Sequence, residues 1–388
     1  MSATVVFFPV GNGDMTLIET DSGKKILIDC RIREGSEHPD VITDLRKRLT
    51  RDSKDRLFID VFIWSHPDED HCLGISKYFH LGKPEDWNED NDLIFINGIW
   101  SSPLVFRRAS KNHTLTGDAK ELNKEAKRRV NKFREVKSMT DGNYVKILAE
   151  DENGKTDDIL DIVLKIDNYT TEINSFYDSS FKANLLGPSP KSDIDEDEEN
   201  LGKNHSSVII NFTLSAGTNS ASYLTGGDAE VVCWETLLKR MKTNNSVKDL
   251  NYDIMLAPHH CSWHTLSHES WSGFKAKGQT AKASDDALEA LGQANESAII
   301  ISSSKSIEDD DTDPPSFAAK NEYLKILDNV SGTFKCVADN IDKDINMPLE
   351  IEISSENGIN IRSASKISSA SVGTPVAAVN RKGGNGYA

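Results

Sequence analysis

Trp64-Ser-His-Pro-Asp-Glu-Asp-His-Cys-Leu-Gly74 is the stretch around which this sequence is organised. It continues Leu57-Phe-Ile-Asp-Val-Phe-Ile-Trp64, an apolar run rich in β-branched and aromatic residues that predicts a buried strand. Two histidines and three acids follow Ser65 within six residues. Imidazole nitrogens and carboxylate oxygens at this spacing can converge on one cation, so the stretch predicts a metal site. The alternative is a solvated polar turn with incidental histidines.

The spacing of His66-Pro-Asp68-Glu-Asp70-His71 resembles the His-x-His-x-Asp-His signature of the metallo-β-lactamase superfamily. Together with Gly74, it is similar to the soluble hydrolase domain of ComEC-like DNA-uptake proteins. The resemblance implies an α/β fold, a four-layer αββα sandwich over residues 1–362, and metal-dependent hydrolysis. Asp68 stands where the wider superfamily has a histidine.

Three further motifs resemble the same family. Tyr223-Leu-Thr-Gly-Gly-Asp228 is similar to its Leu-Thr-Gly-Asp motif, whose aspartate bridges two metals, although Asp228 could instead be a helix N-cap. Pro258-His-His-Cys261 resembles Pro-His-His-Gly, with cysteine in place of glycine, and implies one metal-binding histidine of two. Asn204-His205 stands where the wider superfamily has a histidine ligand, so the role of His205 is open. The implied metal ligands are His66, Asp68, Asp70, His71, Asp228, one of His259 and His260, and, as an open case, His205.

The composition is that of a globular protein, with 37% hydrophobic and 28% charged residues. No stretch approaches the roughly 20 apolar residues that cross a bilayer, and no signal peptide is recognised, so we expect a cytoplasmic protein without a membrane segment. Five cysteines without a Cys-x-x-Cys pair indicate reduced thiols. The net charge of −17 disfavours indiscriminate attraction to nucleic acid, although local patches can override it.

Residues from about 97 to 155 have no recognised counterpart in the family. Between Arg107 and Lys137 this segment carries eleven Lys and Arg against four Asp and Glu. An amphipathic helix is predicted there, with Leu122, Ala126, Val130 and Phe133 on its apolar side. Its outward basic residues, Lys124, Lys127 and Arg128, are candidate contacts to substrate phosphates; the alternative is an ordinary solvated helix.

Other elements follow from apolar patterning and turn residues. Three short strands in an antiparallel meander are predicted within residues 5–29, a helix over 41–49 and a strand over 159–166. A second helix is expected over 316–327, and a final hairpin from 349–354 and 358–362. Residues 191–200 predict an acidic mobile loop, and residues 363–388 a disordered tail.

The ligand set suffices for two divalent metal ions, manganese or zinc, and the carboxylate of Asp68 favours manganese. Two such ions can activate a shared water. Asp70 is predicted to be essential, and His264 or the spare member of the His259 and His260 pair to protonate the leaving group. The leading hypothesis is a phosphodiesterase, a nuclease acting on DNA, alone or with a protein partner in a larger system. The alternatives are an ester, lactone or thioester hydrolase and a metal-stabilised interaction module.

Overall fold

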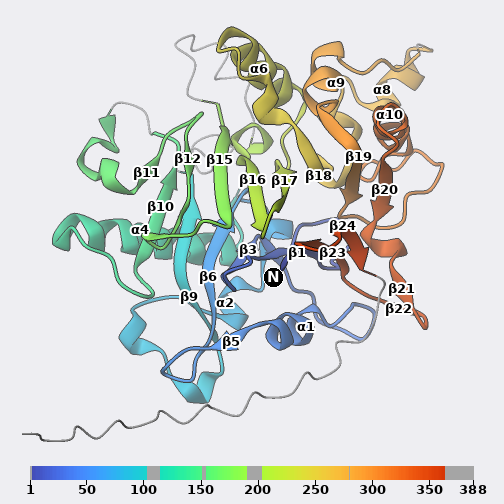
Figure 1. Cartoon of the computed structure of the whole chain (residues 1–388). Coiled ribbons are helices and arrows are strands. Elements are labelled where there is room, and N and C mark those ends of the chain that lie inside the picture. Colours follow the sequence, from blue (N-terminus) through green and yellow to red (C-terminus); the bar gives the residue numbers. More distant parts are fainter. Residues whose placement is uncertain (1, 103–113, 151–153, 190–202, 279, 363–388) are drawn as a thin grey trace, which may run out of the picture.

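The chain folds into two large β-sheets and surrounding helices in a computed structural model, which describes residues 2–102, 114–150, 154–189, 203–278 and 280–362 (Figure 1). In sheet order, the first sheet contains β11 (Val163–Leu164), β10 (Tyr144–Leu148), β9 (Ile94–Ser101), β6 (Leu57–Trp64), β3 (Lys25–Ile28), β2 (Thr16–Glu19), β1 (Ser2–Phe7), β23 (Leu349–Ser354) and β24 (Gly358–Arg362), with β5 (Thr50–Arg51) beside β6 and β8 (Phe79–His80) beside β9. The second contains β12 (Tyr169–Thr170), β15 (Phe181–Gly187), β16 (Ile209–Ala216), β17 (Asn219–Thr225), β18 (Tyr252–Leu256), β19 (Ala294–Ser302) and β20 (Thr333–Cys336).

The helices and short pairings complete a mixed α/β fold. The α-helices are α1 (Val41–Arg48), α2 (Ile75–Tyr78), α4 (Gly117–Val136), α6 (Val231–Thr243), α7 (Pro258–Cys261), α8 (Trp271–Ala276), α9 (Asp285–Leu291) and α10 (Phe317–Asp328). Two-stranded pairings join β4 (Cys30–Arg31) to β7 (Cys72–Leu73), β13 (Glu172–Ile173) to β14 (Phe176–Tyr177), and β21 (Ile341–Asp342) to β22 (Ile345–Asn346).

The predicted N-terminal meander and the C-terminal hairpin are both present and pair with each other. β1, β2 and β3 are antiparallel neighbours, and β23 pairs antiparallel with β1 along its whole length. The hairpin of β23 and β24 has the predicted bounds. The last two strands of the described chain thus belong to the same sheet as its first strand.

Both sheets have a parallel part, which brings distant loops to one edge. β6 is parallel to β3 and to β9, and β18 is parallel to β17 and to β19. Parallel strands end at the same edge of their sheet, where ligands of α/β proteins commonly bind. The loops after β17 and β18 therefore lie together, and the His259 amide donates to Gly227 O at 2.9 Å. The loop after β6 belongs to the other sheet and is joined to the second sheet by the Val208 amide, which donates to Ser65 O at 3.0 Å.

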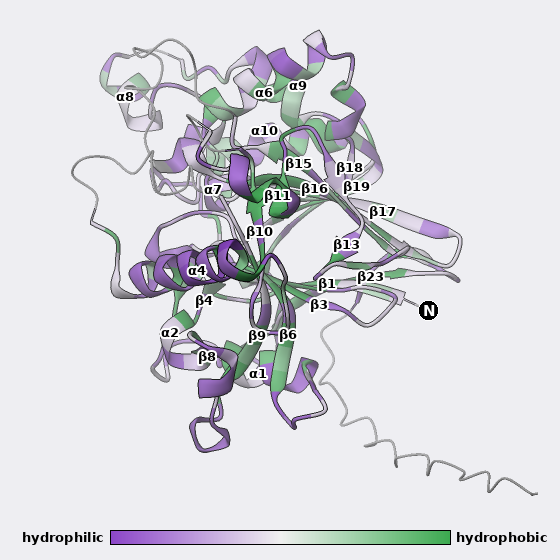
Figure 2. Ribbon diagram, turned by 90° about the vertical axis from the view of Figure 1, so that its left-hand side faces the viewer, coloured by the Kyte–Doolittle hydropathy of each residue, from purple (hydrophilic) through white to green (hydrophobic). Residues whose placement is uncertain are grey.

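Apolar side chains fill the space between the sheets and cover both outer faces. Inward residues of β1, β6, β15 and β16 form one cluster between the sheets. The outer face of the second sheet packs against α6, α9 and α10, and that of the first sheet against α1, α2 and the start of α4. Figure 2 shows these helices on opposite sides of the paired sheets.

The strand predicted over residues 159–166 is wrong for most of its length. The chain there is a 3₁₀ helix, Asp157–Ile162, followed by the two-residue strand β11. The helix is kinked at Ile159, whose φ of −133° is not helical, and Ile159 and Ile162 are both buried. The apolar spacing satisfies this short helix as well as a strand, which is why the pattern misled.

Only part of segment 97–155, which has no recognised counterpart in the family, lies outside the first sheet. Its ends belong to β9 and β10, which pair in parallel, and α4 lies between them in sequence. Parts of this segment (103–113 and 151–153), the predicted acidic loop 191–200 and the predicted tail 363–388 lie outside the described residues.

The predicted amphipathic helix is present as α4, but its basic residues do not all face solvent. Arg128 donates to both carboxylate oxygens of Glu125, at 2.8 and 2.7 Å, and to Asn143 Oδ1 at 2.8 Å. The fully buried Arg129 donates to Glu125 Oε1 at 2.7 Å and to backbone carbonyls of β9. At the other end of α4, Asp118 accepts from the Gly74 amide at 2.7 Å. The helix is therefore held against the sheet and against the loop that carries the predicted metal site.

Candidate metal centre

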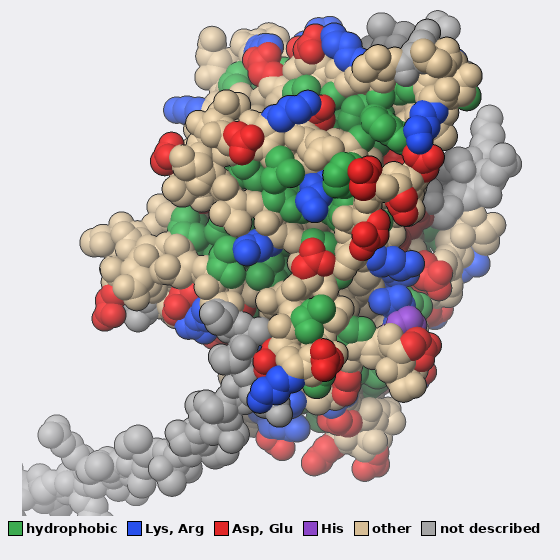
Figure 3. All heavy atoms as spheres, turned by 90° about the vertical axis from the view of Figure 1, so that its right-hand side faces the viewer, with side chains coloured by type: hydrophobic (Ala, Val, Ile, Leu, Met, Phe, Trp, Pro, Cys, Tyr) green, Lys and Arg blue, Asp and Glu red, His purple; other side chains and the backbone are tan. Residues whose placement is uncertain are grey.

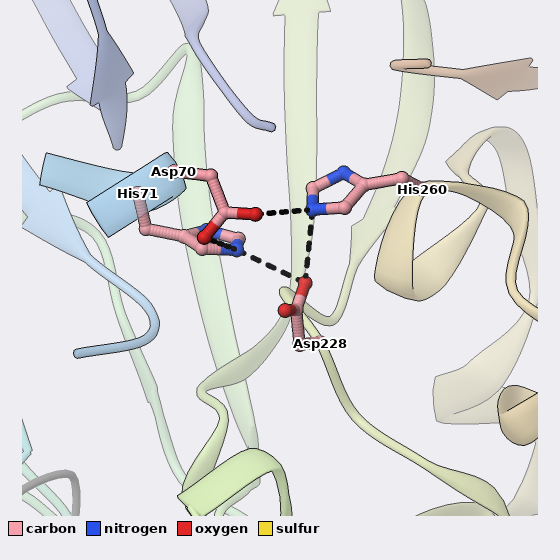
Figure 4. Close-up of side chains that lie close together, drawn as sticks. All are labelled: Asp70, His71, Asp228 and His260. Atoms are coloured by element: carbon pink, nitrogen blue, oxygen red, sulfur yellow. Dashed lines mark hydrogen bonds and ion pairs between the residues drawn. The ribbon is translucent and has the colours of Figure 1, made fainter. Parts of the chain in front are cut away.

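Histidine and aspartate side chains from several strand ends meet at one edge of the sheets. Among the described residues, three groups place one ligand-type atom of each member within 4.8 Å of the others. The first, drawn in Figure 4, joins Asp70 and His71 after β6 to Asp228 after β17 and His260 in α7. The other two groups are Asp14, Asp29 and His71, and His66, Asp68 and Asp228.

Asp228 belongs to two of these groups because its two carboxylate oxygens face different histidines. Oδ1 lies 3.0 Å from His71 Nε2 and 3.4 Å from His260 Nε2. Oδ2 lies 3.8 Å from both His66 Nδ1 and His259 Nε2. One carboxylate thus separates two sets of potential ligands.

Asp29 orients His71 from the side away from Asp228. Its Oδ2 lies 2.8 Å from His71 Nδ1, and its Oδ1 accepts from the Ser65 amide at 2.8 Å. Ser65 Oγ donates to Oδ2 as well. A carboxylate at Nδ1 favours the tautomer that protonates this nitrogen, and so leaves a lone pair on Nε2.

A second hydrogen-bonded chain orients His66. Its Nε2 lies 3.0 Å from Asn204 Oδ1, and Asn204 Nδ2 donates to Glu230 Oε1 at 2.7 Å. With Nε2 as the donor, Nδ1 of His66 has a lone pair; it accepts from the Asp68 amide at 3.4 Å and lies 3.8 and 3.9 Å from carboxylate oxygens of Asp228 and Asp68.

The backbone at the site is strained. His259, His260 and Cys261 have φ values of 51°, 54° and 66°, a left-handed region that residues other than glycine rarely adopt. Cys261, which replaces the glycine of the family motif, is therefore accommodated in the conformation that glycine favours. Consecutive residues of this kind are typical of functional sites, where the surroundings impose the strain.

The buried charges alter one another's pKa values. Burial lowers the pKa of His66 to about 4. Burial acts in the same direction on His260, but the carboxylates of Asp228 and Asp14 outweigh it and raise its pKa to about 10. The pKa of His71 is likewise raised well above its ordinary value, because neighbouring aspartates outweigh burial. A cation binding here has to displace such protons.

The donor set fits divalent cations. Both ring nitrogens of His260 are buried and make no hydrogen bond among the described residues; their closest carboxylate oxygens, from Asp14, Asp70 and Asp228, lie 3.4 Å away. Buried carboxylates gathered this closely are unfavourable unless positive charge compensates them. Mixed imidazole and carboxylate ligands suit manganese and zinc.

Some residues predicted from sequence lie outside the three groups. His205 Nε2 lies 3.4 Å from Glu230 Oε2, and His259 lies between Asp228 and Glu230. His264 is half-buried in the 3₁₀ helix Trp263–Thr265. Lys124, Lys127 and Arg128 are on α4.

Sequence reasoning did not assign Asp14, Asp29, Asn204 or Glu230 to the site. Asp14 and Asp29 were visible as acids at the ends of apolar stretches, in Gly-Asn-Gly-Asp14 and Leu-Ile-Asp29. Both stretches resemble the opening of the family's domain, but they were interpreted only as strands and turns, with no role as metal ligands or as partners of His71.

Divalent cations are expected to stabilise the folded chain. A ligand that binds only the native state raises the free energy of unfolding by about 2.7 kcal/mol at ~100 times its Kd. Calorimetry with manganese or zinc should therefore show a higher Tm than with EDTA. His260→Ala should reduce the rise, whereas it should persist in His268→Ala, since His268 is exposed and paired with Glu235. An equal Tm with and without every metal contradicts the site.

Comparisons with known proteins give a partial likeness to solved structures. No family model matches the chain, and no curated protein matches it. A solved structure described as a metal-dependent hydrolase of the beta-lactamase superfamily is similar over 90% of this chain and 98% of its own, with 11% identity and a TM-score of 0.35. A score of this size does not establish a shared fold, so the chemistry below is inferred from the side chains of this chain. None of the helices in the described ranges combines the length and apolar character needed to span a membrane.

Proposed function

We propose that this chain is a metal-dependent hydrolase of the metallo-β-lactamase type, which holds two divalent ions and hydrolyses phosphodiester bonds in DNA. The observation that carries the proposal is the position of Asp228, whose two oxygens face two sets of ligands, as required of a carboxylate shared by two cations. The succession of helices, sheet, sheet and helices supports the αββα architecture.

The residues divide into two ligand sets. One ion would be held by Asp70, His71, His260 and Oδ1 of Asp228. The other would be held by His66, Asp68 and Oδ2 of Asp228. Carboxylates contribute at least half of the potential ligands in the first set and more in the second, which favours manganese over zinc.

Divalent ions supply Lewis acidity, which makes a water nucleophilic near neutral pH and stabilises the charge that develops on the bond being broken. The chain's own residues orient the ligands and move protons. Asp29 and Asn204 fix the rings of His71 and His66. His259 has a 16% exposed side chain whose Nε2 lies 3.8 Å from Asp228 Oδ2, so it is a candidate to protonate a leaving group, as is His264.

For DNA as the substrate, the support is the family resemblance of the motifs and the exposed lysines of α4. Lys124 and Lys127 face solvent, whereas Arg128 is committed to Glu125 and Asn143. On the face of the molecule drawn in Figure 3, Lys and Arg side chains are scattered among acids and hydrophobic residues. The net charge of −17 disfavours attraction over the whole surface, so we place the association with DNA at α4 and the site.

A substrate panel tests the proposal. The full chain, loaded with manganese, magnesium or zinc, is incubated with single-stranded DNA, duplex DNA, RNA, a chromogenic phosphodiester and a lactone. Cleavage of DNA and of the phosphodiester, abolished in His260→Ala and kept in His268→Ala, supports it. Hydrolysis of the lactone alone selects the ester, lactone or thioester hydrolase, which the net charge of −17 would not hinder. Absence of any turnover, with metal bound, indicates an interaction module.

Charge reversal on α4 tests whether this helix binds DNA. Lys124→Glu with Lys127→Glu is expected to weaken DNA binding and to reduce the salt slope of log K by about 0.9 for each phosphate that the helix no longer neutralises. Arg128 is left intact because it positions Glu125 and Asn143. The matched control is Lys282→Glu with Lys325→Glu, whose side chains are 74% and 69% exposed on other elements. Equal affinity and slope in both double variants would show that α4 does not bind DNA.

A further inference from the structure

Arg31 and Arg33 bring two positive charges together beside the metal centre. The chain is extended from β4 onward, since the Ile32 amide donates to Leu73 O at 2.9 Å. Alternate side chains of extended chain point to the same side. Ile32 is accordingly buried on the other side, while Arg31 and Arg33 are both half-buried.

Two glycines of the Val10 to Asp14 loop make room for these arginines. A Cβ built on Gly11 would lie 2.9 Å from Arg33 Nη2, and one built on Gly13 would lie 2.4 Å from Arg31 Cδ. The Gly13 Cβ would also lie 2.9 Å from the carbonyl oxygen of Asp70. The two guanidinium side chains thus lie along the loop that leads directly into the cluster of acids.

The two arginines differ in what they bind within the chain. Arg31 Nη1 donates to the carbonyl oxygens of Val10 and Asn12, and its buried Nε has no hydrogen-bond partner among the described residues. Arg31 therefore holds the loop in place. Arg33 makes no hydrogen bond or ion pair within the described part of the chain, and its five N–H donors remain available.

The surroundings of Arg33 do not neutralise it. Burial lowers the pKa of Arg33, and the charge of Arg31 lowers it further, while the carboxylate of Glu37 acts in the opposite direction and more weakly. Glu34, next in sequence, pairs instead with Lys77 and Tyr78. Two neighbouring cations without an ion-paired acid are unfavourable in the free chain, and an anion from outside removes that repulsion.

We propose that Arg33, with Arg31 behind it, binds a phosphate group of the substrate that neighbours the phosphodiester being hydrolysed. Guanidinium groups bind phosphate through two parallel N–H···O bonds, which explains an arginine rather than a lysine here. The assignment rests on the proposed hydrolase function, which places the reacting phosphate at the cations. It also gives an acidic protein a local site for a polyanionic substrate.

Binding of inorganic phosphate to the manganese-loaded full chain tests the assignment by titration calorimetry. Arg33→Ala is expected to raise the Kd at least about 10-fold, the usual effect of removing a charge-assisted pair, and Arg33→Lys to raise it less. Arg51→Ala is the matched control, since Arg51 is 47% exposed on β5 at the opposite end of β6. Arg31→Ala is avoided because Arg31 supports the loop.

Kinetics separate this assignment from the hydrolase proposal. Arg33→Ala should raise KM for a short oligonucleotide, which offers a second phosphate, more than for bis(4-nitrophenyl) phosphate, which has one. An unchanged phosphate Kd in Arg33→Ala, or no phosphate binding by the unsubstituted chain, overturns the assignment. A third outcome is a protein that binds phosphate through Arg33 but hydrolyses no substrate. This outcome refutes the proposed hydrolase function and supports the anion site at Arg33.

Discussion

Asp228→Asn is expected to abolish hydrolysis and to remove tight binding of divalent ions. The substitution keeps the size of the side chain but replaces one anionic oxygen with an amide that cannot bind a cation. Asp228 is shared between both ligand sets. The loss of activity and of metal affinity should therefore exceed roughly 100-fold, the upper limit that is typical when a residue that only orients a metal ligand is changed. Activity on the phosphodiester and the metal Kd are both to be measured.

The control for Asp228→Asn is Asp286→Asn, whose side chain is 64% exposed beside Lys242. It should leave both quantities unchanged. Asp228→Asn is expected to lower the Tm in EDTA, because the neighbouring histidines that lower the pKa of Asp228 lose their carboxylate partner, so both quantities are measured at a temperature at which the variant is folded. Retention of one metal and of activity in Asp228→Asn would show that Asp228 is not shared.

The sequence predicted those residues of the site that lie close to one another along the chain or directly after a strand. β6 has the predicted bounds, and its apolar side chains explain why the polar residues after it lie at the sheet edge. Asp228 and His260 each lie within four residues of a strand end, so the structure brings them to the same edge as His66 and His71. The loops after β17 and β18 meet because these strands are parallel neighbours, and the packing of the two sheets places the loop after β6 beside them.

Contacts between single residues far apart in sequence were not predictable in the same way. Asp29 reaches His71 across 42 positions, and Asn204 reaches His66 across 138. Asp29 and Asn204 stand in stretches that resemble family motifs, but nothing in those stretches shows which histidine each side chain contacts. The same limit applies to Arg128, whose apparent place on a basic helix face gave no sign that Asn143 and Glu125 occupy its donors.

Asp29→Asn is expected to weaken metal binding and activity by about 10- to 100-fold, the range typical of residues that orient a metal-binding histidine. The amide cannot accept hydrogen bonds at both former oxygen positions, where Ser65 and His71 now donate. With an amide N–H facing Nδ1, His71 would carry its proton on Nε2, the nitrogen that faces Asp228. That nitrogen would then have no lone pair to offer a cation.

A purely structural role for Asp29 makes a different prediction. Asp60→Asn is the matched control, because Asp60 is also buried, and it accepts from the Lys25 amide at 2.8 Å in the same sheet. Both variants should lower the Tm measured in EDTA, but only Asp29→Asn should raise the metal Kd. If the two variants shift Tm and metal Kd alike, Asp29 serves the fold alone. If only Asp29→Asn changes the Kd, the carboxylate behind His71 sets which nitrogen meets the cation, and the metal centre extends to a residue whose contact with His71 its place in the sequence does not show.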